Sequence, residues 1–156
     1  MTPNQVRIRE LDPAATEALL AKHHVGFMAI SFHDRVTIAL VNYVYADRWI
    51  YARMEDGPDL ATLRHHHWVA FEVSEVQGIY DWRTVTVNGS VQLLSDESPH
   101  DASDVREALE QLRSAVPAVF TPRDPMPQRV QLLRLHADEL KGREARSSER
   151  AGLPAV

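Results

Sequence analysis

The sequence contains no cysteine, which excludes disulfide bonds and thiolate catalysis. No apolar run approaches the roughly 18–20 residues that a membrane-spanning helix needs. Residues 1–7 lack the basic segment and apolar stretch of a secretory signal. The net charge of −5 provides no general attraction to nucleic acid or to anionic membranes. These absences favour a cytoplasmic protein whose partners are neither nucleic acids nor membranes.

The chain also lacks the short motifs of several common enzyme classes. The nucleophile motif GxSxG and the phosphate-binding motifs GxGxxG and GxxxxGK[ST] do not occur. Three consecutive histidines, His65 to His67, lie at the expected C-terminus of a helix, where neighbouring side chains point about 100° apart and cannot all face one ion. We therefore predict no metal site, and we assign no catalytic acid, base or nucleophile.

The composition indicates one globular domain. Of the 156 residues, 44% are hydrophobic and 25% are charged, which is the usual profile of a chain that buries a core. We place this domain at residues 1–146. Polar and small residues predominate in residues 147–156, and we expect them to form a flexible C-terminal tail.

Short runs rich in β-branched and aromatic residues predict β-strands. The first three runs are separated by only four and two residues, which favours hairpins and an antiparallel sheet. The runs are Val25–Ser31, Val36–Tyr45, Arg48–Arg53, Val69–Val76, Thr84–Leu94 and the closing run Gln128–His136. Because a sheet must close or be covered to hide its edges, we predict an α+β fold: an antiparallel split β-barrel with peripheral helices.

Three helices are predicted around this barrel. Asp12 is a suitable N-cap for a helix over Leu11–His23, and a short helix follows at Gly57–Arg64. A third helix begins near Ser103, where apolar residues follow helical spacing. Its expected inward side chains are Val105, Ala108, Leu109, Leu112 and Val116. Prolines then exclude regular structure from the loop at residues 117–127.

Several segments taken in order are more specific than any single motif. They are TIALVNYVY at 37–45, WIYAR at 49–53, VAFEV at 69–73, DWRTVTVNG at 81–89 and LHADELKGR at 135–143. This succession resembles the pyridoxamine 5′-phosphate oxidase-like superfamily of FMN-binding split barrels, especially its small single-domain members. The resemblance covers about residues 10–145.

The resemblance implies a homodimer with two flavin sites in grooves between the subunits. The isoalloxazine ring would lie against the backbone of Leu40–Tyr43, and residues of the neighbouring strand would complete its site. The residues implied to contact the ring are Leu40, Val41, Asn42, Tyr43, Trp82, Arg83 and Thr84. Those implied to hold the phosphate are Arg53, Thr62 and Arg64, together with the start of the helix at Gly57.

The chemistry of Arg53 supports this interpretation without the family. It ends a strand just before a predicted helix N-terminus, where its guanidinium, free backbone N–H groups and the helix dipole suit an anion. The alternative is a solvated arginine at the end of a strand. Trp82 likewise has an alternative, since it could cap the mouth of the barrel instead of stacking on a ring.

One departure from the family pattern affects the phosphate. Two residues after Gly57, where these proteins usually carry a phosphate-binding lysine, this chain has Asp59, and Pro58 before it has no N–H to donate. A carboxylate there repels a phosphate. The resemblance implies an FMN-dependent oxidoreductase acting between a reduced nicotinamide and a small organic molecule, whereas Asp59 leaves two alternatives open. The alternatives are an F420-binding reductase and a non-catalytic, haem- or ligand-binding split barrel with a degenerate flavin site.

Overall fold

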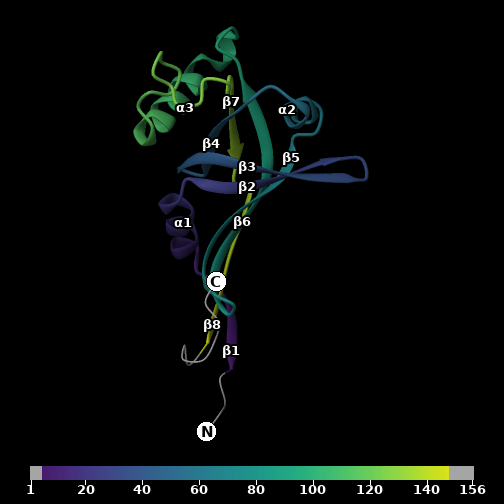
Figure 1. Ribbon diagram of the computed structural model, residues 1–156, viewed down its shortest axis with the longest axis vertical. Helices are drawn as coiled ribbons and strands as arrows, with labels where there is room; N and C mark the ends of the chain where they lie inside the picture. The colour runs from purple at the N-terminus through teal and green to yellow at the C-terminus, as the bar shows by residue number, and fades with distance from the viewer. Residues whose placement is uncertain (1–4, 148–156) are drawn as a thin grey trace.

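The computed structural model describes residues 5–147 and consists of one antiparallel sheet with three α-helices around it (Figure 1). The strands are β1 (Val6–Glu10), β2 (Val25–Phe32), β3 (Arg35–Ala46), β4 (Trp49–Met54), β5 (Trp68–Gly78), β6 (Asp81–Leu94), β7 (Gln131–His136) and β8 (Glu139–Ser147). The helices are α1 (Pro13–Lys22), α2 (Pro58–Leu63) and α3 (Ala102–Ala115), with a 3₁₀ turn at Pro99–Asp101.

The sheet closes because β6 changes partner along its length. Its first part pairs with β5 and β8, and residues 91–94 pair with β7. With the order β6-β5-β2-β3-β4-β7 and the β6–β7 pairing, six strands form a barrel, while β8 and β1 continue the sheet outside it. Figure 1 shows these outer strands as a long stalk below the barrel. The α+β split barrel predicted from the sequence is therefore confirmed.

Two apolar clusters hold the fold together. The first fills the barrel, where the Tyr43 and Phe71 rings meet edge to face at 5.1 Å and α1 contributes Leu19 and Leu20. The second joins α3 to β4 and β7, with Tyr51 and Leu112 among its buried members. The helices thus cover the barrel from outside. None of the helices in the described part of the chain is long and apolar enough to cross a membrane.

The predicted elements agree with the structure apart from the two outer strands and several boundaries. The Asp12 side chain caps α1 as predicted, accepting a hydrogen bond from the Ala15 N–H at 2.7 Å. β1 was not predicted, because its side chains are largely exposed and its place is set by backbone pairing with β8. Ser147, the first residue of the predicted tail, ends β8, and residues 148–156 lie outside the described residues.

At Gly89, β6 passes from its β8 pairing to its β7 pairing. A Cβ atom there would lie 1.8 Å from the His136 carbonyl oxygen, so only glycine lets the two strands approach. We expect Gly89→Ala to lower the free energy of unfolding by about 1–3 kcal/mol or more, measured by urea denaturation. The control is Gly57→Ala, where nothing lies within 4 Å of the added atom. An equal effect of the two substitutions would contradict this account.

Candidate functional site

β3 has one free edge. β2 pairs with it over Arg35–Asn42, whereas β4 pairs on the other side only at residues 43–46. The Tyr43 N–H donates to the His24 carbonyl at 3.0 Å, so backbone groups alternate and those of Leu40 and Asn42 point away from β2. Within residues 5–147, no strand pairs with β3 on that side over residues 35–42. The edge therefore offers backbone donors and acceptors to a ligand.

This edge lines a shallow groove, here called the β3 groove, with a volume of about 160 Å³. Its lining residues are Ala39, Leu40, Val41, Arg53, Met54, Glu55, Asp56, Gly57, Pro58, Asp59 and Arg129. The groove brings Arg53 together with the start of α2 and with Leu40 and Val41.

The Arg53 side chain is committed to an internal partner. It is 8% exposed and forms a two-pronged ion pair with Asp124, whose side chain is 3% exposed, with Nη2 lying 2.6 Å from Oδ1. The Asp124 carboxylate also accepts the N–H groups of Phe120 at 2.8 Å and Met126 at 2.9 Å. Arg53 first, and then these two N–H groups, hold the pKa of Asp124 well below its usual value. The positive charge of Arg53 is thus balanced within the chain.

The predicted ring contacts divide between the two faces of β3. Val41 and Tyr43 point into the core, and the Tyr43 hydroxyl donates to the Leu20 carbonyl at 2.6 Å. Burial raises the pKa of Tyr43 above its ordinary value, so this phenol is not an acid of the site. Leu40 and Asn42 point outward. On the outer face, Leu40 and Asn42 can therefore contact a ligand with their side chains, whereas Val41 and Tyr43 can do so only with backbone atoms.

The prediction that Trp82, Arg83 and Thr84 come from the strand next to β3 is wrong. They lie on β6, and β2 and β5 separate β6 from β3, which places the two strands about 14 Å apart at three strand spacings. Arg83 instead pairs with Glu75 at 2.6 Å, and this contact is the main one that lowers the pKa of Glu75 to about 2. One chain alone does not bring these residues to the β3 groove.

The remaining phosphate candidates lie apart from Arg53. Thr62 and the exposed Arg64 are at the far end of α2 from Pro58, and neither lines the β3 groove. Asp59, which does line it, accepts a hydrogen bond from the Thr37 hydroxyl at 3.1 Å.

Sequence reasoning missed Arg129 and Asp124, which lie in the irregular segment between α3 and β7. Arg129 Nη1 donates to Asn42 Oδ1 at 2.6 Å and lines the β3 groove. The positions of side chains in an irregular segment cannot be predicted from helical or strand periodicity. The run of prolines was the available signal, because a loop that cannot form regular structure must be held by side chains.

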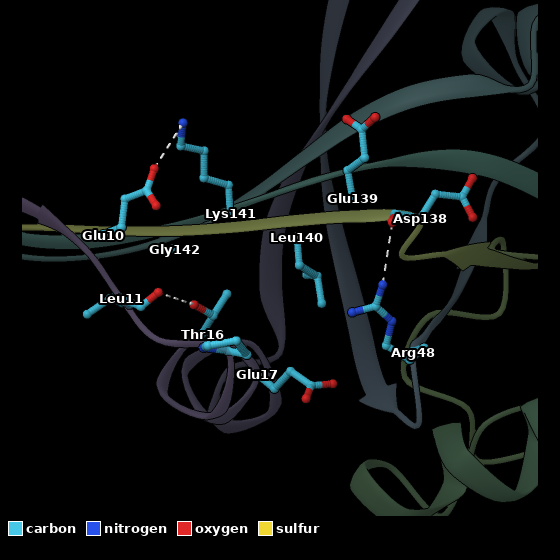
Figure 2. Close-up of a pocket in the computed structure, with 11 residues that line it drawn as sticks. Glu10, Leu11, Thr16, Glu17, Arg48, Asp138, Glu139, Leu140, Lys141 and Gly142 are labelled. Carbon is cyan, nitrogen blue, oxygen red and sulfur yellow. Dashed lines mark hydrogen bonds and ion pairs between the residues drawn. The ribbon is translucent and has the colours of Figure 1, made fainter.

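A larger cavity of about 550 Å³ lies between α1 and β8, and none of the predicted site residues lines it. Figure 2 shows Arg48 directed at the Asp138 carbonyl, a weak contact of 3.4 Å, and Lys141 paired with Glu10 at 3.4 Å. Four carboxylates line it against these two cations, so it is unfavourable for a phosphate. Among residues 5–147, no group of three or more His, Asp and Glu side chains is placed to hold a metal ion.

Comparison with known proteins identifies the family. A family model described as pyridoxamine 5′-phosphate oxidase matches residues 12–144. The chain therefore belongs to the pyridoxamine 5′-phosphate oxidase family. No curated protein matches the chain.

Solved structures share the fold at low identity. A FAD-binding protein from Mesorhizobium loti is 20% identical, with 91% of this chain and 99% of that chain covered and a TM-score of 0.71. A FAD-binding protein from Mycobacterium smegmatis is 18% identical, with coverages of 88% and 98% and a TM-score of 0.63. A flavocytochrome from Azotobacter vinelandii is 17% identical, with coverages of 96% and 71% and a TM-score of 0.64.

We expect Asp124→Asn to destabilise the protein by about 3–5 kcal/mol, because it leaves the buried Arg53 charge without a partner. Since the Asp124 pKa is lowered in the folded state, its contribution is complete above the unfolded value of about 4 and is lost as the pH falls below it. Urea denaturation between pH 7 and pH 3 should therefore show a smaller acid-induced loss in the variant. The control is Asp34→Asn, in an exposed hairpin turn. Wild-type stability in Asp124→Asn would contradict the role of the ion pair.

Proposed function

We propose that the protein is a cytoplasmic, homodimeric flavoprotein that binds FMN in the β3 groove and acts as an oxidoreductase on a small organic substrate. The free edge of β3 is the observation that carries this proposal. The pyrimidine part of a flavin ring presents one N–H donor and several acceptor atoms in a row. Alternating N–H and C=O groups at Leu40 and Asn42 suit such a row, and the apolar Leu40 side chain suits the flat ring.

The groove is too small to enclose a flavin nucleotide by itself. Its 160 Å³ is below the roughly 300–1,000 Å³ of sites for ligands of comparable size. A second copy of the chain would supply the missing wall. Trp82 and Thr84, which one chain keeps away from the groove, could then reach the ring from the partner subunit.

A broad exposed apolar face favours this second copy. Phe27 on β2 is 52% exposed and is paired across the sheet with Leu40, which is 54% exposed, and the neighbouring Ile38 is 71% exposed. Trp68 on β5 adds a large side chain that is 55% exposed. Apolar patches of this kind mark interaction surfaces, and this one continues directly into the β3 groove.

The family and the solved relatives support a flavin over the other cofactors. Two of the structures above are described as FAD-binding proteins and one as a flavocytochrome. No histidine lines the β3 groove, so haem would find no axial ligand from its walls. The bound flavin would supply the redox chemistry, two-electron transfer between a reduced nicotinamide and an organic acceptor. The protein would orient the ring and exclude water.

The first test is the visible spectrum of the purified protein, followed by denaturation and mass identification of any chromophore released. Bands near roughly 370 and 450 nm with released FMN would support the proposal. Released FAD would keep the flavoprotein assignment and replace FMN. Released F420 or haem would overturn the assignment, as would a colourless protein that binds no added flavin.

The phosphate end of the groove is weak, because Asp59 stands at the start of α2 and the Arg53 charge is balanced by Asp124. We expect Asp59→Lys to tighten FMN binding at least tenfold, measured by quenching of flavin fluorescence, since it replaces repulsion by attraction. Glu110→Lys, on the exposed face of α3, makes the same charge change elsewhere. Equal affinities in the two variants would place the phosphate away from α2.

We expect Ile38→Lys to convert the dimer into a monomer of 17.7 kDa, because it places a charge in the middle of the apolar face. Light scattering after size-exclusion chromatography measures the mass. Val130→Lys is the matched control, since Val130 is 62% exposed, close to the 71% of Ile38, but lies in the loop before β7. A monomeric wild-type protein would contradict the dimer.

A further inference from the structure

A second, largely apolar cavity adjoins the β3 groove. This α3 pocket, of about 210 Å³, lies where the end of α3 meets β3 and the loop that follows the helix. Its apolar walls are formed by Leu112 of the helix and by Val116, Val119 and Met126, which follow the helix. Arg129 lies at the junction with the β3 groove. Its volume is below that of sites for drug-sized ligands, so it suits a molecule with a single ring or a short branched chain.

Val116 is an exposed apolar part of the pocket wall. The prediction that it points inward from the helix is wrong, because α3 ends at Ala115 and Val116 is its C-cap residue with an extended backbone. In the structure it is 40% exposed, at the end of the helix and on the pocket wall. An apolar side chain that faces an open cavity gains stability when an apolar ligand covers it.

The two arginines that line the pocket differ in whether a carboxylate balances their charge. Arg53 lines it, but Asp124 balances its charge. Arg129 has only a neutral side-chain partner, the Asn42 amide oxygen at 2.6 Å, and forms no ion pair with any residue of the described range 5–147. An arginine beside an apolar cavity, without a carboxylate of its own, is suited to take one from a ligand through paired hydrogen bonds.

We infer that the α3 pocket binds small carboxylic acids with an apolar body. The body lies between Val116 and Met126, and the carboxylate lies on Arg129. Binding of the acid needs no flavin. Its role as the molecule that reacts beside the flavin rests on the proposed function, because Arg53 and Arg129 line both spaces.

Calorimetric titration with three probes tests this inference, on protein without flavin and on protein saturated with FMN. Benzoate carries both the ring and the charge, benzamide only the ring, and acetate only the charge. We expect benzoate to bind wild-type protein at least tenfold more tightly than either of the others. Failure of benzoate to bind, or equal binding of benzamide, would overturn the inference.

Two pairs of variants separate the charge from the cavity. Arg129→Gln should weaken benzoate at least tenfold and remove its advantage over benzamide, while Arg129→Lys should restore part of it. Arg123→Gln, an exposed arginine of the same loop, should have no effect. Ala115→Leu, which fills the pocket, should weaken benzoate and benzamide alike, whereas Ser114→Leu on the neighbouring exposed position should not.

The outcomes distinguish this inference from the proposed function. Benzoate binding that is unchanged in Arg129→Gln or in Ala115→Leu overturns the pocket, and thermal melts of each variant show whether it remains folded. A protein that binds benzoate as described but no flavin refutes the proposed function alone. A protein that binds FMN but no acid refutes the pocket alone.

Discussion

The ion pair between Arg53 and Asp124 fixes the loop that forms one side of the candidate site. Between α3 and β7 the chain has four prolines, each without a backbone N–H, and it forms no regular helix or strand. The Asp124 carboxylate accepts hydrogen bonds from one guanidinium and from two backbone N–H groups of this loop. Phe120, in the left-handed region at a φ of 56°, lies against the Arg53 guanidinium at 5.1 Å. The loop is thereby tied to β4, and Arg129 is carried to the groove.

The same ion pair also determines which charge remains for a ligand. A family-based interpretation assigns the anion to Arg53, because it ends a strand before a helix. Arg53, however, is buried beside Asp124, whereas the side-chain partner of Arg129 is a neutral amide. The barrel contributes the other half of the site. β2 pairs with one side of β3 up to Asn42, and β4 pairs with the other side only from Tyr43, so the β4 side of β3 is unpaired over residues 35–42. The β3 edge supplies unpaired backbone groups and an apolar wall, and the loop supplies a positive charge.

Most of the barrel could be predicted from the sequence because its strands alternate and its turns are short. β1 could not, since VRIRE buries little and is held by backbone hydrogen bonds to a strand at the other end of the chain. The site was only partly predictable. Leu40 and Arg53 come together because a hairpin joins their strands, whereas Thr84 depends on the order of four strands. Asp124 and Arg129 act through long-range contacts of an irregular loop, which no local pattern encodes.

The pairing of the first strand with the last has a consequence for biosynthesis. β1 pairs with β8, and β6 closes the barrel with a strand that follows about forty residues later, so neither contact can form before β7 and β8 have left the ribosome. Until then the apolar faces of β2, β3 and β5 lie open together. Exposed apolar faces and unpaired strand edges promote association between nascent chains, so the late closure of the barrel prolongs the time at risk.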